Sequence, residues 1–338
     1  MRPPRVRLLP FCLLSAVLAC AQGPPVGVID YFGVRRVPRQ ALETALGLKV
    51  GQPLPRSKGD VEERLEKVAG VVSARLEAVC CEEGKAILYV GIQERGAPRF
   101  DYLETPQGAV RLPEEGHFAY AQFLACVNEA AREGDVEEDL TQGHSLFHRR
   151  ACRQWQEKFQ DLARQHESKL REVLRDSGDD EHRAMAAYLI GYAPEKRTVI
   201  DDLLRAIRDP DDTVRNNAVR SLAAIAILAA RRPDLGLRIS PTWFIEMLGS
   251  LLWQDRRAAL MTLLTLTETR DERLLAHLRE RAMADLKEMA LWHHLPHALP
   301  AFILLGRAAG IPEESIQEAW SRGDRLAFVQ KATAPKKK

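Results

Sequence analysis

The chain has 338 residues, of which 46% are hydrophobic and 28% are charged, and its formal net charge is +2. This length exceeds what one small core needs and predicts two or three domains. The composition excludes a wholly disordered chain. The near balance of acidic and basic residues implies no strong electrostatic partner and argues against nucleic acid.

Residues 1–21 hold three arginines followed by a short apolar run, a layout that predicts a signal peptide cleaved near Gln22. A second interpretation places the cleavage before Cys20. The segment Val17–Cys20 resembles the lipobox of bacterial lipoproteins, which implies a lipid on that cysteine. The apolar run is too short for a membrane-spanning helix. Both interpretations predict export to the periplasm or cell envelope, with membrane contact only through a lipid anchor.

The chain beyond the leader contains Cys80, Cys81, Cys126 and Cys152. An even number of cysteines suits disulfides in an oxidising compartment, while buried free thiols are the alternative. Cys80 and Cys81 are adjacent, so in a strand they point to opposite faces, and one can pack inward while the other bridges. Their spacing matches no zinc-binding pattern.

Residues 26–95 change their hydrophobic period twice. A short strand is expected over 28–32, a helix from Pro38 onward, a second helix on the spacing of Val61, Leu65 and Val68, and two strands over 71–79 and 85–93. The predicted order is β-α-α-β-β, which defines a small α/β domain.

This order, with the segments Phe32–Val37, Leu48–Leu54 and Ile92–Glu94, resembles the POTRA domain of bacterial envelope assembly proteins. The resemblance implies a docking module that captures extended segments by adding a strand to an exposed edge, here the strand 71–79. The expected contact residues are Val71, Val72, Ser73, Ala74, Arg75 and Leu76. The alternative is a small α/β domain of another topology.

Residues 96–113 are rich in glycine and proline and are predicted to form an interdomain linker. Residues 114–178 are predicted to form a helical connector, with helices over 118–132 and 146–175 that cap the part that follows.

Residues 179–330 repeat one spacing of arginine, alanine and an apolar residue at intervals of about 30 to 40 residues, the mark of a helical solenoid. The copies are Arg183, Ala186 and Ile190; Arg215, Ala218 and Leu222; Arg256, Ala259 and Leu263; and a degenerate Ala301 and Leu305. A second helix is expected in each interval, over 198–208, 242–253 and 272–290. Residues 331–338 are predicted to be a disordered basic tail.

The segment Asp209–Ala218 resembles the opening of a HEAT repeat, in which an Asp-Pro turn precedes a Val-Arg-x-x-Ala helix. The resemblance implies that the repeated arginines join carboxylates that brace neighbouring repeats. It also implies that the second helices line a concave surface. The residues expected to be exposed there as partner contacts are Asp201, Asp202, Arg205 and Arg208, the alternative being a solvated face with i,i+4 charge pairs.

Two groups of histidines could in principle bind a metal or act in acid–base catalysis. His293 and His297 have the spacing of metal ligands on a helix, but Pro296 interrupts that helix, so no metal is predicted. His144 and His148 have no nucleophile with an orienting group nearby, so a surface loop is expected there. No catalytic, cofactor or metal residue is predicted.

The sequence therefore predicts a multi-domain protein, a small α/β domain followed by an all-α HEAT-like superhelical solenoid. The predicted function is a non-catalytic protein–protein interaction scaffold that binds envelope or secreted proteins. The alternative is an enzyme or enzyme-accessory protein that holds a small substrate. That alternative requires one concave pocket with convergent polar groups and shifted pKa values.

Overall fold

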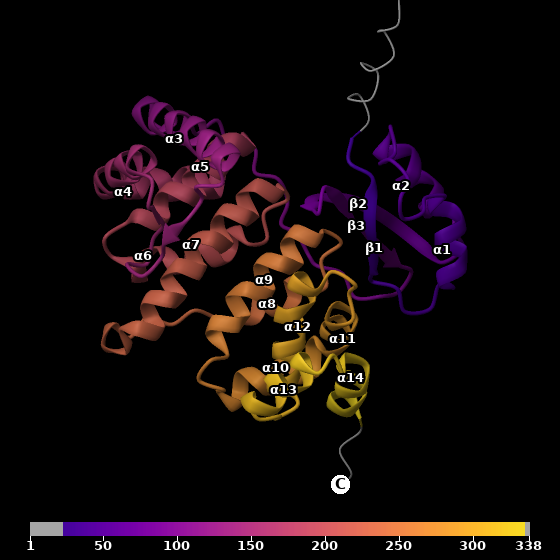
Figure 1. The fold of residues 1–338 in the computed structure, drawn as a ribbon. Helices are drawn as coiled ribbons and strands as arrows, with labels where there is room; N and C mark the ends of the chain where they lie inside the picture. Colours follow the sequence, from indigo (N-terminus) through magenta and orange to yellow (C-terminus); the bar gives the residue numbers. More distant parts are fainter. Residues whose placement is uncertain (1–22, 335–338) are drawn as a thin grey trace, which may run out of the picture.

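The computed structural model describes residues 23–334 (Figure 1). The predicted signal peptide, the lipidation site at Cys20 and the last four residues of the basic tail lie outside the described residues. Residues 331–333, which were predicted to belong to the disordered tail, are helical instead. In the part that is described, no helix has both the length and the apolar character to cross a membrane.

The first five elements follow the predicted order. They are β1 (Val26–Phe32), α1 (Arg39–Leu46), α2 (Lys58–Glu66), β2 (Val71–Glu82) and β3 (Lys85–Glu94). The central strand is β3, which runs parallel to β1 and antiparallel to β2. Gly47 ends α1 in the left-handed conformation, with φ of 65°, and Ser57 caps α2 by accepting a hydrogen bond from the amide of Asp60.

Both faces of the central strand are buried, because β3 is almost entirely covered. One face packs on α1 and α2 through Leu42, Leu65, Leu76 and Val90. The other face belongs to the core of the helical part, which the small domain touches along its sheet (Figure 1). The α/β domain is therefore docked on the helices, and its sheet is an inner layer of the molecule.

The segment 96–113 is irregular, as predicted, but it lies against the helices. The amide of Leu103 donates to the carbonyl of Arg208 at 2.7 Å, and Gly108 exchanges backbone hydrogen bonds with Asp176 and Gly178 at 2.9 and 2.7 Å. A side chain at Gly108 would meet the carbonyl oxygen of Asp176 at 2.4 Å, so only glycine fits this approach. These contacts hold the linker in place between the two parts.

The connector consists of α3 (Glu114–Glu133), the short strands β4 (Glu138–Asp139) and β5 (Leu146–Phe147), and α4 (Arg150–Asp176). The second helix begins later than predicted because Phe147 pairs with Glu138, and its amide donates to the buried Gln156 at 2.6 Å. These bonds draw the start of the expected helix into a strand.

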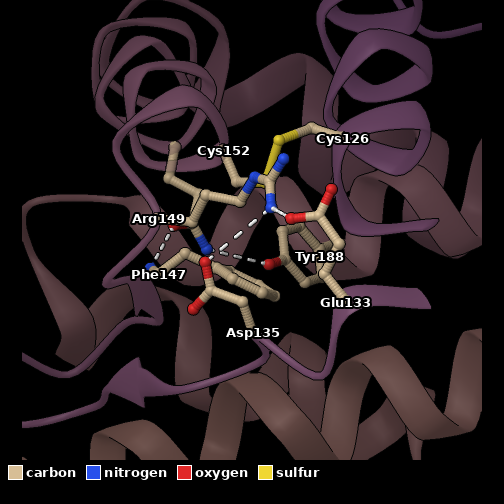
Figure 2. The surroundings of a disulfide bond; sticks show 8 residues. Cys126, Glu133, Asp135, Phe147, Arg149, Cys152 and Tyr188 are labelled. Carbon is tan, nitrogen blue, oxygen red and sulfur yellow. Dashed lines mark hydrogen bonds and ion pairs between the residues drawn. A yellow bond between two sulfur atoms is a disulfide. The ribbon is translucent and has the colours of Figure 1, made fainter. Parts of the chain in front are cut away.

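A disulfide joins Cys126 of α3 to Cys152 of α4, with Cα atoms 5.5 Å apart (Figure 2). Beside it, Arg149 pairs with Glu133 and lies 3.8 Å from Asp135. The two helices are thus crosslinked and their facing ends are bridged by charge. Cys80 and Cys81 form a second disulfide with each other at the exposed end of β2, and neither packs into the core.

The remaining helices are listed in chain order: α5 (Asp180–Leu189), α6 (Lys196–Ala206), α7 (Asp212–Arg231), α8 (Thr242–Met247), α9 (Trp253–Leu266), α10 (Glu272–Arg281), α11 (Met283–Ala290), α12 (Leu295–Ala308), α13 (Glu313–Ser321) and α14 (Arg325–Thr333). Helix α5 packs on α7, α7 on α9 and α9 on α12. The repeated alanines Ala186, Ala218 and Ala259 are fully buried in this row, where small side chains allow close helix approach.

The predicted second helices are partly correct. Helix α6 matches its prediction within two residues, whereas α8 ends at Met247, because the chain turns before α9 begins at Trp253. The segment expected to be one helix over 272–290 is two, because Ala282 leaves the helical conformation at φ −122° and ψ −2°.

Candidate functional site

The repeated arginines form a buried ladder that runs through the helical part. Arg183 donates to both carboxylate oxygens of Asp209, at 2.8 and 2.9 Å. Arg215 reaches Asp255 at 3.1 Å, and Arg256 reaches Asp285 at 3.4 Å. Each arginine is at most 2% exposed. The implied role, in which these arginines join carboxylates that brace neighbouring repeats, fits Arg183 and Arg215, whereas Arg256 pairs with Asp285 inside the interval that follows it.

Each arginine of the ladder also donates to a backbone carbonyl six residues earlier. The acceptors are the carbonyls of Ser177, Asp209 and Ser250, at 3.0, 2.8 and 2.6 Å. These carbonyls lie in the turns that precede α5, α7 and α9. One side chain therefore closes the turn before its own helix and binds a carboxylate further along the chain, which is why the arginine recurs at one spacing.

The α/β domain docks on this ladder through the turn after β1. The ring of Phe32 lies 4.5 Å from the guanidinium of Arg256, and Arg35 donates to Asp285 at 2.8 Å. The amides of Gly33 and Val34 donate to Glu288 at 2.8 and 3.2 Å. Burial raises the pKa of Glu288, and these amides and Arg256 oppose the rise. The carboxylate of Asp285 thus binds both Arg256 of the ladder and Arg35 of the small domain.

The three clustered histidines also belong to this interface. Asp30, which is 2% exposed, accepts from the amide of His293 at 2.9 Å and lies 2.6 Å from its ring. His297 lies 2.6 Å from the hydroxyl of Tyr89, whose ring stacks on Trp253. In residues 23–334 no group of three or more histidine, cysteine, aspartate or glutamate side chains could hold a metal ion.

Acid should weaken this interface. Burial, then the nearby His294 and Arg257, lower the pKa of His297 from 6.5 to about 4. In the unfolded chain His297 is therefore protonated near pH 6.5, whereas in the folded chain it is protonated only near pH 4. Folding stability is lost as the pH falls through this window. We expect the urea midpoint to drop between pH 7 and pH 5, and His297→Asn to reduce that drop.

The control for this measurement is a histidine whose surroundings differ from those of His297. The groups that face His297 are the hydroxyl of Tyr89, the ring of His294 at 4.0 Å, Trp253 and, beyond His294, the carboxylate of Glu82. His148 is half exposed and faces Glu137, so His148→Asn should leave the drop unchanged. An equal drop in His297→Asn and the wild type would contradict the assignment.

The predicted strand-addition edge of β2 is partly capped by its own domain. The amide of Ala74 donates to Glu66 at 3.0 Å and that of Leu76 donates to Glu62 at 2.7 Å. The carbonyl of Ala74 accepts from Arg75 at 2.7 Å. Such capping keeps an edge strand from pairing with other chains. A partner strand over Ala74–Leu76 must first displace two carboxylates.

The start of the same strand is more accessible. The register shifts between Val71 and Ser73, and the side chain of Val72 is 56% exposed. Val72 and Ser73 border a cleft of about 370 Å³ that Phe100, Tyr102 and Leu251 also line. An exposed strand end therefore meets an apolar cleft between the two parts of the molecule.

The four residues expected on the concave surface divide into two groups. Asp202 is buried and paired with Arg171 at 2.5 Å and Arg175 at 3.6 Å, so the prediction that all four are exposed is wrong for this residue. Its side of α6 faces α4. Arg208 binds Asp101 of the linker at 2.8 Å and its side chain is only 21% exposed, so the prediction of an exposed residue is wrong here as well. Asp201 and Arg205 are exposed, and their contact with a partner stays a prediction.

A cavity of about 430 Å³ lies where the connector meets the first repeat. Its lining comes from the β4–β5 loop, α4, the turn before α6, the start of α6, α7, and the segment that follows α7. The residues are Gln142, His144, Gln160, Arg164, Tyr192, Ala193, Pro194, Glu195, Lys196, Arg197, Leu228, Leu235 and Leu237. The loop residue His144 is 9% exposed, so the expected surface loop is wrong at this position.

Several hydrogen bonds hold the polar side of this cavity. The hydroxyl of Tyr192 donates to the carbonyl of Ser145 at 2.8 Å, and the side-chain amide of Gln160 lies 3.3 Å from Nε2 of His144. Gly143, at φ +77°, lets the loop approach: an added Cβ would lie 2.7 Å from Leu228 and 3.2 Å from Lys196. Burial and the charge of Lys196 lower the pKa of His144 to about 4.

Lys196 lies at the first turn of α6 and is 6% exposed. Its ammonium donates to the carbonyl of Gly191 at 2.6 Å and lies 3.5 Å from His144. Burial alone lowers its pKa from 10.5 to about 8. The convergence of polar groups with shifted pKa values, which was not predicted from the sequence, is therefore present here. The one sequence signal near it was Gln142-Gly143-His144-Ser145.

Comparison with known proteins gives one match. Residues 167–236 match a model of HEAT repeats, a range that includes the first two arginines of the ladder and Lys196. No curated protein and no solved structure gives a significant match to the chain.

Proposed function

We propose that the protein is a non-catalytic protein–protein interaction scaffold of the bacterial cell envelope. The observation that carries the proposal is the HEAT-repeat match over 167–236, because repeats of this kind generally mediate protein interactions. The buried ladder and the docked α/β domain support it, since they hold two potential binding surfaces in one fixed arrangement. The partners we propose are envelope or secreted proteins.

The envelope location rests on the leader in residues 1–21, with Cys20 as the site of a lipid anchor in the second interpretation. The disulfide between Cys126 and Cys152 supports an oxidising compartment. The superhelical form of the repeats and a concave binding surface at Asp201 and Arg205 belong to the same proposal.

For the α/β domain we propose POTRA-like docking in which a partner segment adds to β2. The strand order and the exposed start of β2 support this, and the capped amides of Ala74 and Leu76 restrict it to the end near Val72. There an extended segment gains main-chain hydrogen bonds and a cleft for a side chain, the two components of strand addition.

The test uses two valines of the same domain. Val72 is 56% exposed beside the cleft, and Val50 is 61% exposed on the turn after α1. We expect Val72→Glu to reduce capture of the partner from envelope extract at least tenfold, because it buries a charge in the contact. Val50→Glu should capture as much as the wild type. Equal capture by both variants would contradict docking at Val72.

The cavity beside Lys196 favours a second candidate, an enzyme or enzyme-accessory protein that uses the repeats to hold a small substrate. Its support is the convergence of His144, Gln160, Tyr192 and Lys196 on one cavity. This function concerns a different face of the molecule from β2, so the two candidates are separable by experiment.

A further inference from the structure

The cavity beside Lys196 contains a cation without a carboxylate partner. Among the described residues, Lys196 takes part in no ion pair, and its ammonium has only the Gly191 carbonyl and the His144 ring within hydrogen-bonding distance. The three buried arginines of the ladder each bind an aspartate. The fold thus compensates its other buried cations and leaves this one facing a cavity.

A buried ammonium carries a large desolvation cost unless an anion compensates it. With a pKa of about 8, Lys196 still holds its proton at neutral pH. The one acid in the lining, Glu195, is at the mouth and caps α6 by accepting from the amide of Arg197 at 3.4 Å. The field of the first turn of α6 also favours negative charge at this position.

The rest of the lining defines the ligand further. Gln142 and Gln160 offer amide groups, and Arg164 and Arg197 add positive charge at the mouth, whereas Leu228, Leu235 and Leu237 form an apolar wall. The volume of about 430 Å³ is that of a small-molecule site. One buried cation in the same cavity as these leucines matches a single carboxylate on an apolar body.

We infer that this cavity binds an organic carboxylate whose oxygens pair with the ammonium of Lys196 and whose apolar part lies on Leu228, Leu235 and Leu237. Two sources share this chemistry, a free aliphatic or aromatic acid and the C-terminal carboxylate of a peptide. The inference deepens the second function proposed above, and it does not depend on the scaffold.

The experiment is calorimetric titration of the purified full chain at pH 7 with sodium octanoate and with octanamide, its neutral counterpart. We expect octanoate to bind at least tenfold more tightly than octanamide. Lys196→Met should weaken octanoate at least tenfold, while Lys287→Met, at an exposed lysine of α11, should leave it unchanged. The second pair of ligands is N-acetyl-Leu-Leu with a free C-terminal carboxylate and the same peptide as its C-terminal amide. Tighter binding of octanoate would identify a free acid as the ligand, and tighter binding of the peptide acid would identify a peptide C-terminus.

Removal of a buried uncompensated charge should leave the melting temperature of Lys196→Met at or above that of the wild type. If this variant fails to fold, Leu235→Glu places a negative charge on the half-exposed apolar wall and should also weaken octanoate at least tenfold. Inorganic phosphate bound in place of either acid would overturn the carboxylate assignment. So would octanoate affinity within twofold of wild type in both variants. Capture of the partner by the wild type and by Val72→Glu tests the scaffold function separately.

Discussion

Asp255→Ala is expected to lower the free energy of unfolding by about 3 to 5 kcal/mol, because it leaves the guanidinium of Arg215 buried without its partner. Arg215 is 1% exposed and Asp255 4% exposed, and the carboxylate also accepts from Ser250 at 2.7 Å. Urea unfolding followed by circular dichroism measures the change. Typical domains are stable by only about 5 to 15 kcal/mol, so the urea midpoint should fall steeply.

Two further variants separate the ladder from a general loss of side chains. Arg205→Ala removes an exposed arginine of α6 and should cost less than about 0.5 kcal/mol. The double variant Arg215→Met/Asp255→Leu replaces the pair by apolar groups and should recover most of the loss. A cost below about 1 kcal/mol for Asp255→Ala would contradict a bracing role.

The ladder variant should also loosen the docked segment. Tyr102 lies 4.6 Å from the guanidinium of Arg215 and 3.3 Å from Ser250, so the linker rests on the altered pair. We expect limited proteolysis of Asp255→Ala to cut within residues 96–113 faster than in the wild type. Cleavage at an unchanged rate would mean that the linker is held independently of the ladder.

The double variant Cys126→Ser/Cys152→Ser is expected to lose about 3.5 kcal/mol of stability. The two cysteines are 26 residues apart, and the entropy that such a crosslink removes from the unfolded chain gives a value of this size. Dithiothreitol should lower the urea midpoint of the wild type to that of the variant. Because Cys80 and Cys81 are adjacent and close no loop, Cys80→Ser/Cys81→Ser is the matched control and should change the midpoint little. Equal effects of both double variants would contradict the crosslink between α3 and α4.

The sequence was sufficient for features that are encoded locally. Alternating and helical periods give the order of the elements over 26–95, and the Val-Arg-x-x-Ala spacing around Arg215 gives the ladder, because each arginine closes a turn six residues away. The late start of α4 was not predicted, because it depends on the pairing of Phe147 with Glu138 and on the buried hydrogen bond from the amide of Phe147 to Gln156.

No local sequence pattern predicts the docking of the α/β domain on the helices. The cavity has no such pattern either. Arg35 meets Asp285 across 250 residues of chain, and neither has a periodic neighbour that marks the pair. The cavity brings together a loop, three helices, a turn and the segment after α7, and nothing near Lys196 in the sequence reveals that its ammonium is buried. Asp202 was misassigned because the charges of α6 alone do not show that this side of the helix faces α4.

The scaffold function is tested most directly by photo-crosslinking in a diderm bacterial host that exports the chain with its own leader. A benzophenone amino acid replaces Val72 in one strain and Val50 in another, two positions of similar exposure in one domain. The proposal predicts one discrete crosslinked envelope protein from position 72 and only background from position 50. Background alone from position 72, with the chain correctly exported, would contradict docking by the α/β domain.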